Sequence, residues 1–271
     1  MIDTAGNVSV LCVVGDVWGV IQLHDVVYVV YRWSSAIRRF NATTHQPLTE
    51  INVRGLDVPC DIVACERTSQ LYVADGETLG NNCVWRVSAD GTDMTHWLPK
   101  SPDDTFKPWT LSVTSTRLLV TSLDTRQLRQ FDADGDELRR VQLPDHMEPW
   151  HAVESQTGTF IVGLKNTQLD QWQVVEVNTG GEVLRQFSGS RLTSLGLTEH
   201  VAVDSHGNIF VADVDNRHIL LLDDHLSLRR VIIDYHQLDY KPPVRLCYRE
   251  DKGQLLVALW RRVAVFDVLR R

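Results

Sequence analysis

The chain has 271 residues, of which 43% are apolar, so it can form a large hydrophobic core and is not a disordered polypeptide. No run of eighteen apolar residues occurs, and the sequence therefore predicts no membrane-spanning helix and no membrane partner. The formal net charge of −8 argues against a protein dominated by nucleic-acid binding, although it leaves room for a local basic face.

The five cysteines are an odd number and have no framework spacing. They are Cys12, Cys60, Cys65, Cys83 and Cys247. This pattern favours reduced, buried thiols over a disulfide scaffold. We therefore expect a cytoplasmic protein.

Short runs of alternating apolar residues begin near the N-terminus and recur in six copies along the chain. The copies start, in order, with VWGVI (17–21), PCDIV (59–63), PWTL (108–111), PWHA (149–152), TEHVAV (198–203) and PVRL (243–246). Each start is followed by a strongly apolar run such as VVYVVYR, QLYVAD or QLLVALW. Turn-forming residues separate the runs, which is typical of short antiparallel strands.

The fifth copy, residues 198–233, is the clearest one. It contains VAVD, NIFVAD, HILLLD and SLRRVII, with Ser205-His206-Gly207 as the first turn. Four such strands form a sheet that is too small to bury both of its faces alone, so it needs neighbours.

The copies start roughly 40 to 50 residues apart, which is the spacing of propeller blades. The sixth copy has only three strands. Residues 7–14 (NVSVLCVV) form one further strand, which precedes the first copy and belongs to none of the six. We therefore predict an all-β, six-bladed β-propeller of four-stranded blades in a single domain, 1–271. The N-terminal strand completes the last blade, which removes two exposed sheet edges.

The segment HVAVDSHGNIFVADVDNRHILLL, with Asp213 and Asn216-Arg217 ahead of its third strand, resembles the NHL-repeat family of six-bladed propellers. The second copy keeps the aspartate as Asp75, whereas the third and fourth have Ser122 and Leu164 there. The resemblance implies a binding function. NHL propellers often form the substrate- or RNA-recognising end of tripartite-motif ubiquitin ligases, and a minority are enzymes such as amidating lyases.

In a propeller, the inner strand of each blade starts beside the central channel, and the turn between the second and third strands lies on the same face. This connectivity predicts an inner ring of Trp18, Cys60, Trp109, Trp150, Glu199 and Val244. The surrounding rim includes Arg32, Arg126 and Arg217.

Three tryptophans in this ring have two interpretations. An aromatic mouth edged by arginine and glutamate is common in peptide, sugar or base recognition. Alternatively, Trp109 and Trp150, which follow prolines, pack between adjacent blades. A buried indole N–H also needs a hydrogen-bond partner, which makes tryptophan a costly plug for a channel.

Metal-dependent catalysis has weaker support. In amidating lyases, histidines at the ring positions hold a zinc ion, and no ring position is histidine here. His151 and His200 lie one residue further along, in two copies only. A calcium site of the lactonase-like propellers needs several oxygen ligands, and Glu199 is the only carboxylate in the ring. We therefore predict no metal, no cofactor and no catalytic residue.

The favoured hypothesis is a non-catalytic, monomeric recognition module, such as the substrate-recognition part of a ubiquitin-ligase-type protein. It binds a protein or peptide segment with Trp18, Trp109 and Trp150 as stacking anchors. Glu199, Arg32, Arg126 and Arg217 orient that segment. The alternative is an RNA-binding NHL domain, to which recurring Arg-Arg pairs near the outer strands contribute. A metal-dependent hydrolase or lyase is the third hypothesis.

Overall fold

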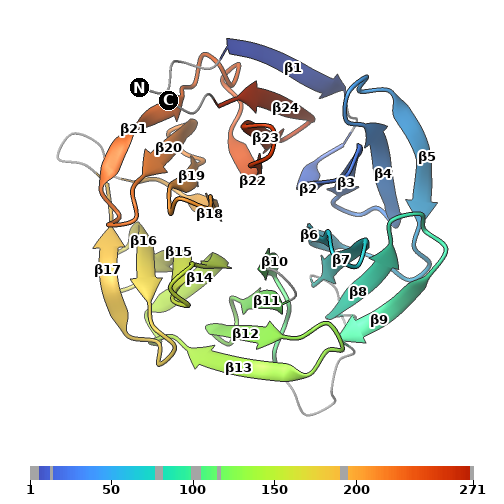
Figure 1. Cartoon of the computed structure of the whole chain (residues 1–271). Coiled ribbons are helices and arrows are strands. Elements are labelled where there is room, and N and C mark those ends of the chain that lie inside the picture. Colours follow the sequence, from blue (N-terminus) through green and yellow to red (C-terminus); the bar gives the residue numbers. More distant parts are fainter. Residues whose placement is uncertain are drawn as a thin grey trace.

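The computed structural model describes residues 6–12, 15–76, 82–98, 105–114, 117–189 and 195–268, and these residues form strands, turns and loops without a helix. Six four-stranded antiparallel sheets stand around a central channel (Figure 1). This confirms the predicted all-β, six-bladed β-propeller. The described residues contain no helix that could cross a membrane.

The blades follow the chain in order. Blade 1 consists of β2 (Val17–Leu23), β3 (Val26–Tyr31), β4 (Ala36–Asn41) and β5 (Pro47–Asn52). Blade 2 consists of β6 (Pro59–Cys65), β7 (Gln70–Asp75), β8 (Cys83–Ser88) and β9 (Met94–Leu98). Blade 3 consists of β10 (Thr110–Thr114), β11 (Arg117–Ser122), β12 (Gln127–Phe131) and β13 (Glu137–Gln142).

Blade 4 consists of β14 (Met147–Glu154), β15 (Phe160–Asn166), β16 (Gln171–Val177) and β17 (Val183–Phe187). Blade 5 consists of β18 (Thr198–Val203), β19 (Ile209–Asp213), β20 (His218–Leu222) and β21 (Leu228–Ile233). Blade 6 consists of β22 (Pro243–Arg249), β23 (Gln254–Leu259), β24 (Arg262–Asp267) and the N-terminal β1 (Gly6–Cys12).

The N-terminal strand closes the ring as predicted. β1 pairs antiparallel with β24, and Leu11 lies opposite Val263 in this pairing. A second backbone contact joins blade 6 to blade 1: the N–H of Val17, in β2, donates to the carbonyl of Trp260, in the turn between β23 and β24, at 3.2 Å. Because both ends of the sequence contribute to one sheet, the last blade has the same four strands as the others.

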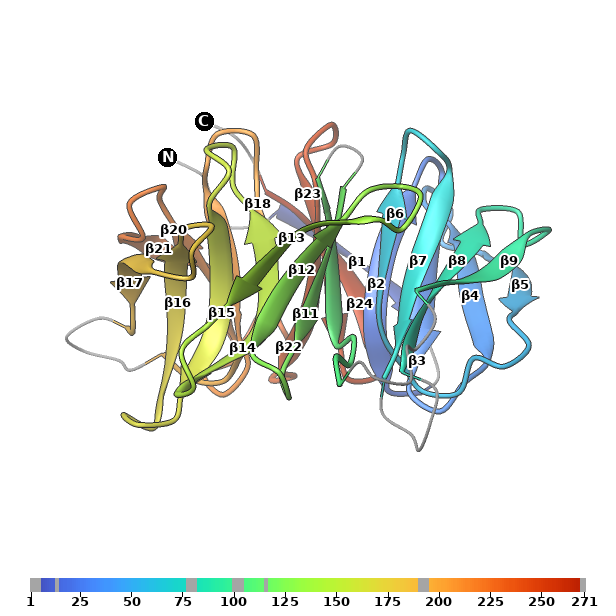
Figure 2. The same cartoon turned by 90° about the horizontal axis from the view of Figure 1, so that it is seen from below.

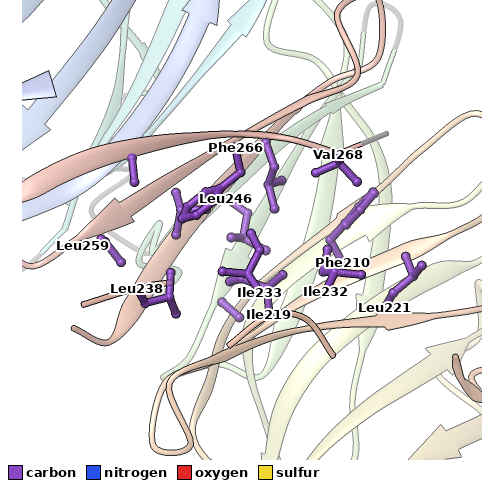
Figure 3. Close-up of a cluster of buried hydrophobic side chains, with 14 residues drawn as sticks. Phe210, Ile219, Leu221, Ile232, Ile233, Leu238, Leu246, Leu259, Phe266 and Val268 are labelled. Atoms are coloured by element: carbon purple, nitrogen blue, oxygen red, sulfur yellow. The ribbon is translucent and has the colours of Figure 1, made fainter. Parts of the chain in front are cut away.

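The hydrophobic core is divided among the six interfaces between neighbouring blades. The alternation within β3 shows why: Val27, Val29 and Tyr31 face blade 6, whereas Tyr28 and Val30 face blade 2. Figure 3 shows the cluster between blades 5 and 6, which includes Phe210 and Phe266. Each blade therefore buries both of its faces only through its neighbours.

The inner strands share one irregularity where they begin. In five blades the pairing register between the first and second strands skips one residue. The skipped residues are Trp18, Cys60, Trp150, Glu199 and Val244, and β10 of blade 3 begins directly after Trp109. A β-bulge re-aims the side chains around it. The predicted inner ring is thus a set of structurally equivalent positions.

The acidic run at 132–136 is a hairpin turn between β12 and β13, as its Asp-Gly pair predicts. The Asp132 carboxylate accepts hydrogen bonds from the backbone N–H groups of Asp134, Gly135 and Asp136, each at 3.0 Å. Gly135 has φ of 95°, which glycine adopts without the steric cost of a side chain. The carboxylate therefore stabilises the turn through local hydrogen bonds.

Candidate functional site at the channel mouth

One face of the propeller collects the elements from which a site can be built. The inner strands begin on this face, and the turns from second to third strands and the connections between blades also lie on it; Figure 2 shows the ring from the side. We call it the mouth face. Residues of the inner ring and of the rim therefore come together here from all six blades.

Ring tryptophans form a continuous row across the mouth. Trp18 of blade 1 contacts Trp109 of blade 3 edge-to-face at 5.7 Å between ring centroids. Trp109 contacts Trp150 at 6.0 Å, and Trp150 contacts Trp172 at 5.4 Å. Because Trp18 and Trp109 belong to blades 1 and 3, their contact joins the two blades that flank blade 2.

Burial of this row leaves polar groups without partners. The Nε1 atoms of Trp109 and Trp150 are buried, and neither has a hydrogen-bond partner among the described residues. An unsatisfied buried donor costs about 1–3 kcal/mol. The four side chains of the row are themselves only half-buried. Its predicted role as a set of stacking anchors stays a prediction.

A single arginine lies at the centre of the axial groups. The side chain of Arg245, from β22, is only 4% exposed. Its Nε lies 3.7 Å from Oδ1 of Asp61, and its Nη1 lies 3.3 Å from Oε2 of Glu199. Nη2 donates to the carbonyl of Cys60 at 3.1 Å. Arg245 thereby connects blade 6 to blades 2 and 5, and it lies 6.0 Å from the Trp18 ring.

Asp61 and His151 are fixed by backbone hydrogen bonds. The two Asp61 oxygens accept the N–H groups of Ile62 and Leu111, both at 2.9 Å. His151 Nε2 lies 3.1 Å from the carbonyl of Leu111 and must donate to it, because a carbonyl only accepts. His151 Nδ1 then accepts the N–H of Val201 at 3.4 Å.

Burial determines the charge states of this group. It raises the pKa of Asp61 to about 6, although Arg245 and the two backbone N–H groups act in the opposite direction. Burial, together with the charge of Arg245, lowers the pKa of His151 to about 3. The pKa of His200 is also lowered by burial, and its ring stacks on His151 at 3.6 Å. Both imidazoles are therefore neutral at pH 7.

Among the described residues, one cluster is compact enough to be tested as a metal site. It consists of Asp61, His151 and His200, whose potential ligand atoms lie within 4.8 Å of one another. Both ring nitrogens of His151 are used in backbone hydrogen bonds, and each Asp61 oxygen already accepts one backbone N–H. Only Nδ1 of His200 is buried without a partner, and the positive charge of Arg245 is adjacent. This arrangement does not fit a divalent cation.

The rim arginines have three different environments. Arg32 lies over the rings of Trp18 and Trp33, at 4.6 Å and 5.3 Å. Arg126 lies 4.0 Å from the carboxylate of Glu148. The Arg217 side chain is exposed and makes no hydrogen bond or ion pair with any described residue. The structure thus brings Arg32 to the tryptophan row, while Arg126 and Arg217 lie in the turns of blades 3 and 5. Their predicted contact with a ligand stays a prediction.

Two exposed tryptophans edge the mouth on neighbouring blades. Trp33 is 62% exposed in the turn between β3 and β4, and Trp260 is 58% exposed in the turn between β23 and β24. These turns are equivalent positions of blades 1 and 6. The accessible aromatic surface is therefore on the rim, outside the half-buried inner row.

The aspartate that characterises the repeat has a structural role in blade 2. Asp75 accepts hydrogen bonds from the N–H groups of Asp57 and Val58, at 3.1 Å and 2.9 Å, and from Nε1 of Trp85 at 3.3 Å. It thus holds the segment that enters blade 2 from blade 1. In blade 3, Ser122 takes this role by accepting the N–H of Lys107 at 3.3 Å.

Sequence reasoning found the inner ring but did not anticipate the Arg245–Asp61–Glu199 cluster. Asp61 and Arg245 each follow a ring residue directly, as His151 and His200 do. Charged or titratable residues at this position in four of six copies were the available signal. It gave no indication of which of them meet across the channel.

No family model matches the chain, and no curated protein matches it. Solved structures do resemble it. A streptogramin B lyase has a TM-score of 0.70 at 12% identity, over 97% of this chain and 98% of that chain. A catalytically inactive virginiamycin B lyase from Staphylococcus aureus, solved with quinupristin, has a TM-score of 0.67 at 13% identity, over 93% of this chain and 80% of that chain.

A nidogen/laminin complex contains a third similar chain, with a TM-score of 0.64 at 15% identity, over 82% of this chain and 81% of that chain. These likenesses show the fold alone: the chain is a six-bladed β-propeller. The closer resemblance to NHL repeats, and the RNA binding and tripartite-motif context that it implies, stay predictions.

Proposed function

We propose that this propeller is a non-catalytic recognition module that binds a protein or peptide segment at the mouth face. The proposal rests on the distribution of exposed aromatic side chains. Four large aromatic side chains are exposed among the described residues: Trp33, Tyr235, Tyr240 and Trp260. All four lie on the mouth face, in the sector of blades 5, 6 and 1. Tryptophan, tyrosine and arginine are the residues that dominate binding energy at protein interfaces.

The other exposed apolar side chains have a different character. Leu169 lies in the turn between β15 and β16, and the other six are aliphatic residues on outer strands: Val10, Leu48, Leu138, Leu184, Leu228 and Val231. Single aliphatic residues on an outer strand are ordinary surface features. The concentration of aromatics on one sector is therefore specific to the mouth face.

The axial groups support recognition over catalysis. Arg245 forms ion pairs with both Asp61 and Glu199, and His151 has both ring nitrogens in hydrogen bonds. A ligand at the mouth meets aromatic rings before it meets titratable groups. The nidogen/laminin complex is an example of this architecture in a protein assembly. As part of a larger protein, the propeller would then select the partner.

The test is selection of binding segments from a displayed library of random fifteen-residue peptides. Selected peptides are measured against the parent and against Trp33→Ala/Trp260→Ala. Each anchor is worth about 2 kcal/mol, so we expect a loss of at least roughly 30-fold in affinity. Leu138→Ala/Leu184→Ala removes two similarly exposed side chains from outer strands and should leave affinity unchanged. Selection of no peptide that discriminates the tryptophan variant would refute the proposal.

The same protein should be titrated with single-stranded RNA. Tight RNA binding that decreases steeply with salt and depends on Trp33 and Trp260 would favour the RNA-binding alternative.

A further inference from the structure

The connection from β21 to β22, residues 234–242, carries an aromatic cluster that the sequence analysis did not single out. Tyr235 lies 4.1 Å from the His236 ring and 5.5 Å from the Tyr240 ring, between centroids. The hydroxyl of Tyr240 and Nδ1 of His236 are 2.9 Å apart, within hydrogen-bond distance. We call these three residues the aromatic platform. Tyr235, His236 and Tyr240 are all exposed.

Local hydrogen bonds hold the platform in one conformation. The Asp234 carboxylate accepts the N–H groups of His236 and Gln237, at 2.9 Å and 3.0 Å. The N–H of Tyr240 donates to the carbonyl of Tyr235 at 2.8 Å. A surface loop with this many internal bonds loses little entropy when it binds a partner.

The platform is also anchored to blade 6. Leu238 is fully buried in the cluster between blades 5 and 6 (Figure 3). Nη2 of Arg262 donates to the carbonyl of Leu238 at 2.9 Å, and Nη1 of Arg262 lies 3.2 Å from the Asp239 carboxylate. Arg262 is two residues from Trp260, so the platform and the exposed tryptophan share a support.

Tyr240 has a backbone conformation that favours glycine. Its φ is 60°, in the left-handed region, and its side chain is 53% exposed. A bulky residue in this region is uncommon and strained. Strain of this kind concentrates at ligand-binding sites. At 53% exposure the Tyr240 ring gains little from burial, and its face is accessible to a partner.

Two cations beside the platform have unpaired side chains. The side chains of Arg217 and Lys241 are exposed and make no hydrogen bond or ion pair with any described residue. The carboxylates nearby are engaged: Asp234 by the two N–H groups, Asp239 by Arg262, and Asp215 by the N–H of Leu197 at 2.8 Å. His218 follows Arg217 and its ring contacts Tyr235 at 6.0 Å, which places Arg217 at the edge of the platform.

We propose that the aromatic platform, with Arg217 and Lys241, docks a carboxylate-bearing extended segment of the protein partner. This inference rests on the proposed function and identifies the chemical class of its ligand. Apolar or aromatic residues of the segment lie against Tyr240 and Trp260, and its carboxylates accept hydrogen bonds from the two free cations.

The experiment compares three displayed peptide libraries with the same apolar and aromatic positions. Their remaining positions are Asp/Glu, Lys/Arg or Asn/Gln. We expect enrichment from the Asp/Glu library alone. The enriched peptides should bind Arg217→Glu/Lys241→Glu at least 10-fold more weakly than the parent, and Tyr240→Gly at least 5-fold more weakly. The matched control, Arg67→Glu/Lys252→Glu, reverses two exposed cations in turns of the opposite face and should retain full affinity.

Each other outcome has one interpretation. Enrichment from the Lys/Arg or Asn/Gln library, with binding that depends on Trp33 and Trp260, overturns this inference and leaves the proposed function standing. Equal loss in the control and in Arg217→Glu/Lys241→Glu also overturns it, because the effect would then be general electrostatic attraction. If no library yields peptides that depend on Trp33 and Trp260, both proposals fail. Tight binding of an oligouridylate in place of every peptide identifies a nucleic-acid partner and likewise overturns the inference.

Discussion

Replacing Arg245 with methionine tests whether the axial charges hold the ring together. Arg245 is buried and forms ion pairs with Asp61 and Glu199 from two other blades. Methionine has a similar length and no charge, so it fills most of the space but leaves both carboxylates without their cation. It also removes the donors to the carbonyls of Cys60 and Val244.

Loss of one partner from a buried ion pair costs about 3–5 kcal/mol, because an uncompensated charge stays in a low-dielectric interior. We expect the free energy of unfolding to decrease by that amount at pH 7. Glu199 is 20% exposed at its side chain and relaxes toward solvent, so Asp61, at 2%, accounts for most of the loss.

The loss of unfolding free energy in Arg245→Met should depend on pH, and the pKa of Asp61 determines the direction of that dependence. Burial holds the pKa of Asp61 at about 6, above its ordinary value of 3.8. A raised pKa means that the folded state binds more protons between these values, so this group's stabilising contribution is complete below pH 3.8 and is lost as pH rises through 6. That difference corresponds to about 3 kcal/mol. Removing Arg245 raises the pKa further, so the deficit of the variant should shrink between pH 7 and pH 5.

The assay is urea unfolding of the parent and of Arg245→Met at pH 7 and pH 5, followed by circular dichroism and tryptophan fluorescence. Lys252→Met, which removes an exposed cation in the turn between β22 and β23, is the control and should change stability by less than about 0.5 kcal/mol. A deficit below about 1 kcal/mol at pH 7, or one that is equal at both pH values, would refute the assignment of Arg245 as the axial counter-ion.

Two further substitutions test other parts of the argument. Gly19→Ala places a Cβ 2.8 Å from side-chain atoms of both Ile62 and Val30, at the contact of blades 1 and 2, and should lower the free energy of unfolding in urea by about 1–3 kcal/mol. An unchanged unfolding midpoint would show that the two blades separate easily. Tyr240→Gly removes a side chain from a left-handed residue and should raise the free energy of unfolding by about 1 kcal/mol while it weakens peptide binding, whereas a loss of stability would contradict a binding role for this strained tyrosine.

The sequence determines the blade. Alternation within β3, the Ser205-His206-Gly207 turn and the recurring inner-strand starts are local patterns, and they suffice for six four-stranded sheets. The pairing of β1 with β24 that closes the ring was also predictable, because the last copy lacks one strand and the N-terminal strand belongs to no other copy. Membership of the inner ring follows from the same repeat, since equivalent positions in a closed ring face the same channel.

The site was only partly accessible in this way. The tryptophans Trp18, Trp109 and Trp150 were found by position, but the repeat does not tell which side chains touch across the channel. Arg245 reaches the carbonyl of Cys60, 185 residues away in sequence, and no local pattern links the two. The platform of Tyr235, His236 and Tyr240 was missed because it lies in a connection between blades, outside the repeat.

What the sequence determined is therefore the repeat, and what the tertiary structure decided is the set of contacts between repeats. Strand alternation and turn chemistry act over a few residues and are written in each copy. Burial of Asp61 and His151, and with it their altered pKa values, arises only when the six inner strands converge around the axis. Desolvation depends on neighbours brought together by ring closure, and that is a property of the whole propeller.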